Sequence, residues 1–586
     1  MRESAFLLAD PDALRECRRV VRVLQFFGVP SRNLDAADFP FGDDTGGSTS
    51  HKIRVLCSAG AYLRVIEDWE QRPDYARWWT TSVHSAFVYP GDDLDSLQRL
   101  ARILNRGHGA EICKINSAGT DLAVSGQLSG FCGVMAGVRS AATKSKSNGN
   151  LVLTAASEDA INIISLGHRA IFSKLEYKGV PVFLLTSGEI IDIDAELTSQ
   201  NFDVREHFLS AVPLVLYIKW AFAETCWNAP EVNACLVIDD PLLKRTHGFV
   251  DFKELLSLMK RHKFSTNIAF IPWNWRRSAP EVVRLFRENP EHFSLSVHGC
   301  DHTRAEFGSS SRQRLYWKAR QALERMNRHR SITGIRHDPV MIFPQGIFSE
   351  AAMSALRQTD LIAAVNNDVI SADPCPRATK ISDVWDIALT GYTFPLFTRR
   401  YPWEGIENFA FDALLGKPAI AVIHHDYCND HCANLVNFIQ QLNALQCATT
   451  WRALGDVVRR SCRQREVSPG KVEVEMYGAE LRIENRFDQS KHFVIRRREC
   501  EPSAIQCICA DSQMIAWKPG NGHVDFEIEL NPGETRVIKI RFHDLAEQRH
   551  KGDNLLYRLK AMLRRYLCEV RDNYIVPTRS RFTGAR

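Results

Sequence analysis

Two segments of the sequence place metal-binding side chains directly after apolar, strand-like runs. The first run leads into the adjacent carboxylates Asp239 and Asp240, and the second, residues 293–297, leads into His298 and His302. Neighbouring carboxylates repel each other unless a cation or a hydrogen-bond donor compensates, although an Asp at a strand end is also a common helix cap. Two imidazoles four residues apart on a helical turn project from one face, a spacing that suits a divalent metal. Together the two segments predict a metal site.

Two further segments also end predicted strands. Pro344-Gln345-Gly346 combines residues that fix a turn and let a ligand approach the backbone closely. The apolar run 419–422 leads to His424, His425 and Asp426. A histidine at a buried strand end can act as a general acid, whereas a lone one is more often a core residue. Two histidines followed by an Asp favour the catalytic interpretation.

These four segments need a scaffold that brings strand ends together. Between Ala234 and about Arg460, strand-like runs alternate with helical ones, which fits a barrel of parallel strands better than an open sheet. Barrel enzymes carry their chemistry at the carboxyl ends of the strands. The predicted strands are Ala234–Ile238, Thr266–Ile271, Phe293–Val297, Val340–Phe343, Leu361–Val365, Asp383–Leu389 and Ala419–Ile423.

In this order, the Asp-Asp, His-x-x-x-His, Pro-x-Gly and strand-end His segments resemble the motifs of the NodB-type polysaccharide deacetylases. The resemblance runs from Ala234 to about Arg460 and implies a distorted barrel of βα units that binds one divalent metal ion, usually zinc. It implies the following roles: Asp239 as the catalytic base, Asp240, His298 and His302 as metal ligands, and His424 as the general acid with His425 as the alternate. The residues expected to contact the substrate are Pro344, Gly346 and Asp301.

The sequence departs from the family's motifs at two places. The third motif normally has an Arg two residues before the proline, which braces the catalytic base, but Ile342 stands there. Arg336, Arg399 or Arg400 could supply the brace instead. The family's Asp-x-x-Asp-Trp motif is matched only in part by residues 383–386, where the same residue types occur in a different order. These departures indicate a divergent branch of the family.

The expected reaction is hydrolysis of an N-acetyl group on an amino-sugar-containing glycan or glycan precursor. Two imidazoles and one carboxylate leave metal positions open for water and substrate, as catalytic sites require. Two alternatives stay open. The barrel could hydrolyse another amide or a glycosidic bond, or it could be an inactive glycan-binding or scaffold protein, which the missing Arg favours.

The regions around the barrel predict three further parts. Residues 1–228 alternate strands and helices as in an open α/β sheet, and the barrel is expected at 229–464. Residues 465–545 alternate apolar and polar positions between turn signals, which is typical of a small β-sandwich. Residues 546–586 form a basic helical tail with an apolar stripe. This pattern is most often a packing helix with a solvated face, and the alternative is contact with a membrane surface or an anionic carrier.

Composition limits the remaining classes of function. The formal net charge of +5 argues against a dedicated nucleic-acid binder. The 16 cysteines are scattered, and neither a signal peptide nor a spanning helix is evident, so a cytoplasmic location is expected. The longest apolar stretch, Phe208–Ala223, contains Pro213 and Lys219 and predicts a buried helix.

Overall fold

The computed structural model describes residues 4–8, 13–33, 53–106, 110–115, 120–141, 150–154, 160–543 and 554–576. The chain divides into two compact units, of which the first holds residues 1–195, 203–228 and 445–447. The second holds residues 196–202, 229–444 and 448–586. The domain boundaries expected from the sequence stay predictions. Residues 546–553 and 577–586 of the predicted tail lie outside the described residues.

The first unit contains a mixed sheet in the order β2-β1-β3-β4-β11-β10-β9-β6-β7, with β5 and β8 beside this path. Strands β1, β3, β4 and β11 pair in parallel and the later strands pair antiparallel, so the expected open α/β sheet is confirmed. Helix α6 is buried nearly all round, as its uniform apolarity predicts. The elements are β1 (Ala5–Leu8), α1 (Leu14–Phe26), β2 (Ser31–Asn33), β3 (Ile53–Ser58), α2 (Ala59–Gln71), α3 (Pro73–Ser82), β4 (Val83–Tyr89), α4 (Leu94–Leu104), β5 (Glu111–Ile115), β6 (Asp121–Val124), α5 (Ser129–Cys132), β7 (Arg139–Ala141), β8 (Asn150–Thr154), β9 (Ile161–Leu166), β10 (Arg169–Tyr177), β11 (Val180–Leu185) and α6 (Phe208–Ala221).

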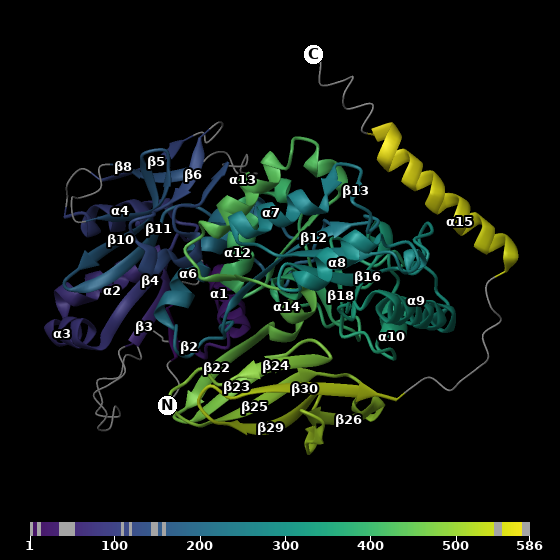
Figure 1. Cartoon of the computed structure of the whole chain (residues 1–586). Helices are drawn as coiled ribbons and strands as arrows, with labels where there is room; N and C mark the ends of the chain where they lie inside the picture. Colours follow the sequence, from purple (N-terminus) through teal and green to yellow (C-terminus); the bar gives the residue numbers. More distant parts are fainter. Residues whose placement is uncertain are drawn as a thin grey trace, which may run out of the picture. The chain divides into compact units, whose positions relative to one another are not determined.

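The second unit contains the barrel, drawn in teal and green in Figure 1. Its parallel strands follow the order β19-β18-β17-β16-β15-β12-β20, and a parallel bridge between Arg400, just after β19, and Ala421 in β20 joins the two edges. The expected seven-stranded barrel is therefore confirmed. The strands are β12 (Val232–Asp239), β15 (Thr266–Phe270), β16 (Phe293–His298), β17 (Val340–Ile342), β18 (Ala363–Asn366), β19 (Leu396–Thr398) and β20 (Ala419–Ile423). The other elements are β13 (Thr246–His247), β14 (Val250–Asp251), α7 (Phe252–His262), α8 (Pro280–Glu288), α9 (Arg312–Thr333), α10 (Glu350–Leu356), α11 (Ile381–Trp385), α12 (Ile406–Leu415), α13 (Ala433–Asn443), β21 (Thr449–Trp451) and α14 (Leu454–Arg460).

One predicted strand is wrong. Residues 383–389 do not form the sixth strand of the barrel, because their first part belongs to the short helix α11. That helix buries Ile381, Val384 and Trp385, whose spacing of three and four residues matches a helical face rather than the alternation of a strand. The sixth strand is β19, which is only three residues long and therefore gives a weak periodic signal.

The β-sandwich follows the barrel and belongs to the same unit. One sheet has the order β22-β23-β25-β29-β28 and the other has the order β24-β30-β26-β27. Alternate side chains of both sheets, such as Val474, Ile495 and Ile538, form the core, so the predicted sandwich is confirmed. The strands are β22 (Cys462–Ser468), β23 (Lys471–Met476), β24 (Glu480–Glu484), β25 (Lys491–Arg498), β26 (Ile505–Ala510), β27 (Gln513–Met514), β28 (Trp517–Pro519), β29 (His523–Leu530) and β30 (Thr535–Phe542).

The last described element is helix α15 (Leu555–Val570), which continues as a short π-helical turn over Arg571–Ile575. Asn554 caps it by accepting a hydrogen bond from the Leu556 backbone N–H. Within the described part of the chain, no helix combines the length and the apolarity needed to cross a membrane.

Candidate active site

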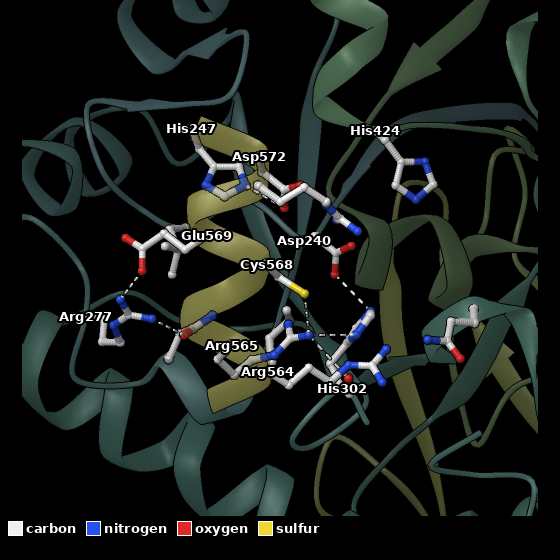
Figure 2. A pocket seen from close by; sticks show the side chains of 15 residues that line it. Asp240, His247, Arg277, His302, His424, Arg564, Arg565, Cys568, Glu569 and Asp572 are labelled. Carbon is white, nitrogen blue, oxygen red and sulfur yellow. Dashed lines mark hydrogen bonds and ion pairs between the residues drawn. The ribbon is translucent and has the colours of Figure 1, made fainter. Parts of the chain in front are cut away.

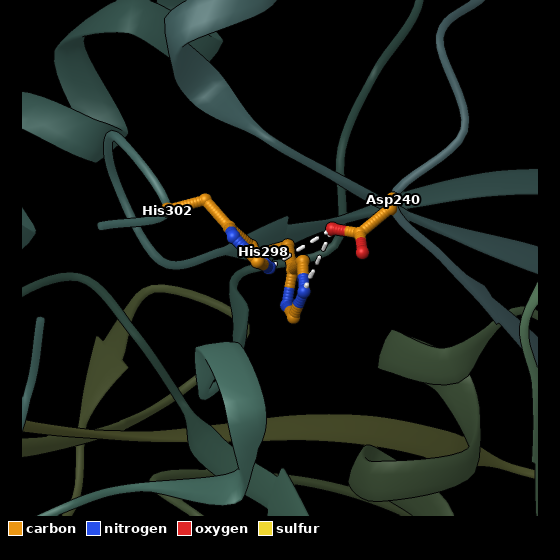
Figure 3. Close-up of side chains that lie close together, drawn as sticks. All are labelled: Asp240, His298 and His302. Atoms are coloured by element: carbon orange, nitrogen blue, oxygen red, sulfur yellow. Dashed lines mark ion pairs between the residues drawn. The ribbon is translucent and has the colours of Figure 1, made fainter. Parts of the chain in front are cut away.

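Three ligand atoms converge at the carboxyl ends of β12 and β16. Oδ1 of Asp240 lies 3.3 Å from His298 Nε2 and 3.0 Å from His302 Nε2 (Figure 3). A metal with bonds of about 2.1 Å holds tetrahedral ligands roughly 3.4 Å apart, so these separations fit a small divalent ion. Among the described residues no hydrogen bond of good geometry reaches the buried Oδ1 of Asp240, which leaves it available as a ligand. The residues present therefore fit the metal that the sequence predicts.

The hydrogen bond made by His298 determines which of its ring nitrogens is free to bind a metal. Nδ1 of His298 lies 3.1 Å from the backbone oxygen of Ile342, which can only accept a hydrogen bond. The proton therefore sits on Nδ1, and Nε2 presents its lone pair towards Asp240. Ile342 thus contributes its carbonyl oxygen at the position where the family has an Arg.

The loop between the two histidines is not the helical turn expected from their spacing. Gly299 and His302 both have left-handed backbone conformations, with φ of 59° and 56°. A Cβ on Gly299 would lie 2.4 Å from Cγ of Pro344, so only glycine fits there. This tight loop, rather than a helix face, places the two imidazole ring centroids 4.8 Å apart.

Glu306 holds that loop in place. Its carboxylate accepts backbone N–H groups from Cys300 at 2.9 Å, Asp301 at 2.8 Å and His302 at 3.1 Å. Three donors on one carboxylate fix the loop's path, because a charge-assisted hydrogen bond is about twice as strong as a neutral one. Glu306 is therefore a positioning residue for His302, a candidate metal ligand.

Asp239 has the brace that the third motif lacks. Nη1 and Nη2 of Arg399 donate to its two oxygens at 2.8 Å and 2.7 Å, and both side chains are buried. Burial alone would raise the pKa of Asp239, but Arg399 and the nearby His298 lower it below its usual range. The carboxylate is therefore held ionised in a fixed orientation. Of the three arginines considered from the sequence, Arg399 makes this contact.

The two neighbouring histidines at the end of β20 differ in their surroundings. His424 lines a cavity of about 160 Å³ together with Asp239, Asp240 and both histidine ligands. His425 is buried, and its Nε2 lies 3.6 Å from Oδ1 of Asp572 rather than beside the ligand cluster. The structure therefore brings His424 to the cluster and turns His425 away from it.

Helix α15 forms one wall of a second cavity, of about 240 Å³, which shares Asp240, His302 and His424 with the first (Figure 2). Nη2 of Arg565 lies 3.3 Å from both Nδ1 and the backbone oxygen of His302. Glu569 forms ion pairs with Lys244 and Arg277. Ion pairs and hydrogen bonds thus hold this helix against the loops that carry the site.

The three residues expected to contact the substrate have different environments. Gly346 lines the smaller cavity, whereas Pro344 lies under Gly299. The Asp301 carboxylate is buried and accepts hydrogen bonds from Arg325 at 2.6 Å and from Lys318. Asp301 therefore faces away from the cavity, because these cations occupy its oxygens. The partial match to the Asp-x-x-Asp-Trp motif, residues 383–386, does not line the smaller cavity either. Its Asp386 accepts a hydrogen bond from the sandwich residue Tyr477.

Sequence reasoning missed most of the residues that support the cluster. Glu306 and Arg565 belong to no motif, and no signal in the sequence relates them to the ligands. Arg399 was one of three candidates for the brace of Asp239. The short apolar run before it, which forms β19, is the signal that could have placed Arg399 at the end of a barrel strand. Tyr401 also lines the smaller cavity and stacks on Trp403, with ring centroids 4.2 Å apart.

Several solved structures of carbohydrate deacetylases and esterases resemble this chain. No protein-family model matches the sequence, and no curated protein matches it either. The carbohydrate deacetylase Agd3 aligns over 92% of this chain and 98% of its own at 10% identity, with a TM-score of 0.47. Peptidoglycan deacetylase PdaC from Bacillus subtilis aligns over 39% of this chain and 91% of its own at 13% identity, with a TM-score of 0.24.

A family 4 acetyl xylan esterase from Clostridium thermocellum, solved with a cobalt ion, aligns over 38% of this chain and 89% of its own. Its identity is 10% and its TM-score is 0.25. We assign the fold from strand order and register, and we take the chemistry of the site from its own residues.

Proposed function

We propose that this protein is a metal-dependent hydrolase that removes N-acetyl groups from an amino-sugar-containing glycan or glycan precursor. The observation that carries the proposal is the convergence of Asp240, His298 and His302, whose ligand atoms all lie within 4.8 Å of one another. Beside them stand a braced carboxylate, Asp239, and a histidine, His424, in one cavity. Zinc is the ion we expect, because two imidazoles and one carboxylate are a common catalytic zinc set.

The side chains divide the reaction between them. A bound divalent ion would supply Lewis acidity, which polarises the amide carbonyl and makes water more acidic. Asp239, ionised and oriented by Arg399, would accept the proton of the attacking water. His424 would give a proton to the amide nitrogen as the C–N bond breaks. The water oxygen would form the new C–O bond, the C–N bond would break, and the products would be acetate and a sugar with a free amine.

The alternative of an inactive glycan-binding or scaffold protein was favoured by the absent third-motif Arg. The bidentate contact from Arg399 removes that reason, because Asp239 has its brace from a different strand. Hydrolysis of another amide or of a glycosidic bond would release a product other than acetate from an N-acetylated sugar. Identifying the product therefore distinguishes these alternatives from our proposal.

The test combines metal content with acetate release from a panel of N-acetylated oligosaccharides. We expect about one divalent ion per chain, and we expect His298→Ala with His302→Ala to lose both the ion and acetate release. The matched control is His492→Ala with His523→Ala, because these histidines lie in the sandwich on β25 and β29. It should keep both properties.

Two results would contradict the proposal. Metal binding without acetate release from any N-acetylated sugar would keep the site but reject this substrate class. Protein that takes up neither zinc nor cobalt would favour the scaffold alternative.

A further inference from the structure

Helix α15 and the turn after it carry most of the exposed apolar side chains of the described chain. Of the sixteen large hydrophobic residues that are exposed there, ten lie between residues 555 and 575. Leu563 is 60% exposed and Leu567 is 59% exposed. The ten residues are Leu555, Leu556, Leu559, Met562, Leu563, Tyr566, Leu567, Val570, Tyr574 and Ile575. Tyr566 also contacts Trp273 and Arg277 of the barrel. The concentration of the other apolar side chains on one helix indicates a binding face.

The opposite face of the helix is already occupied by the barrel. Tyr557 donates to Asp301 at 3.0 Å, Arg565 contacts His302 at 3.3 Å, and Asp572 lies near His425. Ala561 and Arg565 are buried beneath the helix. The helix therefore has an inner, polar face that meets the loops of the active site, and an outer, apolar face.

Charge is divided between the two faces in the same way. Residues 554–576 contain two acidic residues. Glu569 pairs with Arg277 of the barrel, and Asp572 pairs with Arg571 and lies near His425. Arg558 and Lys560 are exposed beside the apolar residues. The outer face thus combines apolar side chains with positive charge and carries no exposed carboxylate among its described residues.

An open pocket on this helix combines the same apolar and basic side chains. Leu563, Leu567 and Cys568 line it, and Lys560 and Arg564 contribute positive charge around them, while the charge of Arg571 is compensated by Asp572. Apolar chains beside a basic rim suit a lipid, whose acyl chain is apolar and whose phosphate is anionic. A neutral protein partner would match the apolar residues but not the charge.

We propose that the outer face of α15 binds the surface of an anionic lipid membrane. The helix would lie in the plane of the interface, with its leucines at the acyl boundary and Arg558 and Lys560 at the phosphate groups. Because the inner face contacts His302, the membrane would lie over the mouth of the metal site. The inference goes beyond the proposed deacetylase activity and does not depend on it, since vesicle binding needs no substrate.

The test is flotation of the full chain with vesicles of phosphatidylcholine alone or mixed with phosphatidylglycerol. We expect the chain to float with the anionic vesicles and to remain below with the neutral ones. Leu563→Glu with Leu567→Glu, and separately Arg558→Glu with Lys560→Glu, should each weaken binding by about tenfold or more. Added salt should weaken binding of the unchanged chain as well.

The matched control is Ile332→Glu with Met514→Glu, which makes the same kind of change at exposed apolar residues elsewhere on the same unit. It should bind vesicles like the unchanged chain. Thermal melting and acetate release from a small N-acetylated sugar, measured on every variant, show whether the fold and the metal site are retained.

Three outcomes would overturn the membrane proposal. The unchanged chain fails to float with anionic vesicles, or the control pair weakens binding as much as the α15 pairs. The third is a dimer of the unchanged chain in analytical ultracentrifugation that Leu563→Glu with Leu567→Glu dissociates, because a second copy would then cover this face.

Discussion

Asp239 and Asp240, at one end of the barrel, differ from Asp338, at the other end, in how burial and neighbouring groups set the carboxyl pKa. At the carboxyl ends of the strands, Asp239 has Arg399 and Asp240 faces His298 and His302, and the pKa values of both carboxyls are lowered despite burial. At the other end, Asp338 precedes β17 and accepts a long hydrogen bond of 3.3 Å from the amide of Asn267. Burial raises the pKa of Asp338 to about 6. The groups facing Asp239 and Asp240 thus outweigh burial, whereas at Asp338 burial outweighs the nearby Arg459.

Three residues that line the cavities at the carboxyl end have left-handed backbone conformations. Asp240, His302 and Gln345, which all line both cavities, have positive φ values of 77°, 56° and 61°. Left-handed conformations at such residues cost about 1–3 kcal/mol each and persist only where the surroundings enforce them. The contacts around these three residues therefore hold them in place at a cost in stability.

The largest expected effect separates the two adjacent carboxylates. Asp240→Asn should lose the metal, whereas Asp239→Asn should retain it, because only Asp240 faces the two imidazoles. Both variants should reduce kcat/KM by roughly a thousandfold, since each removes about 4 kcal/mol of transition-state stabilisation. Metal analysis and acetate release measure the two properties. Asp368→Asn, at a third carboxylate of the smaller cavity, is the control that should keep its metal.

The next effect compares two adjacent buried arginines. Arg399→Met should lower kcat about a hundredfold, because Asp239 loses its orientation, while KM changes little. Arg400→Met should lower the melting temperature but leave kcat nearly unchanged, because Arg400 binds Asp412 outside the cavity. Steady-state kinetics and thermal melting give both readings. Equal losses of kcat in the two variants would show that Arg399 acts only through stability.

A smaller effect is expected at Glu306. Glu306→Gln keeps the size of the side chain but replaces one accepting oxygen by an amide donor, which opposes the backbone N–H groups of the loop. Metal affinity should fall roughly 10- to 100-fold, as for other residues that orient a ligand. Isothermal titration with zinc measures it. Glu324→Gln, at an exposed position on α9, should bind zinc like the unchanged protein, and a Glu306→Gln variant that does the same would reject the positioning role.

The smallest effect belongs to the opposite end of the barrel. The folded-state pKa of Asp338 lies above its unfolded value of 3.8, so its contribution to stability is present at low pH and is lost as pH rises through about 6. Between about pH 5 and pH 7 the unfolding free energy should fall by about 1 kcal/mol relative to Asp338→Asn. Denaturant unfolding of the two proteins across this range is the measurement. If the unfolding free energies of the two proteins change in parallel with pH, Asp338 is charged at both pH 5 and pH 7 and its pKa is not raised.

The sequence determined the barrel, the sandwich, and the candidate residues for chemistry within each strand-end segment. Each of those segments joins an apolar run to its functional residue directly, so short-range patterns were sufficient. The roles of Asp239, Asp240, His298, His302 and His424 remain predictions, and the structure brings all five side chains to one cavity. His425 and Asp301 stand in equally polar segments but face other partners, which no short-range pattern encodes.

Only the tertiary structure decided what surrounds the ligands. Arg399 reaches Asp239 across 160 residues of chain, and Arg565 reaches His302 across 263. The three-residue strand β19 was missed and a helix was predicted as a strand, because short buried segments show too little periodicity to distinguish the two. Contacts of this kind depend on how strands and helices pack, and packing pairs residues by their position in space rather than by their spacing along the sequence.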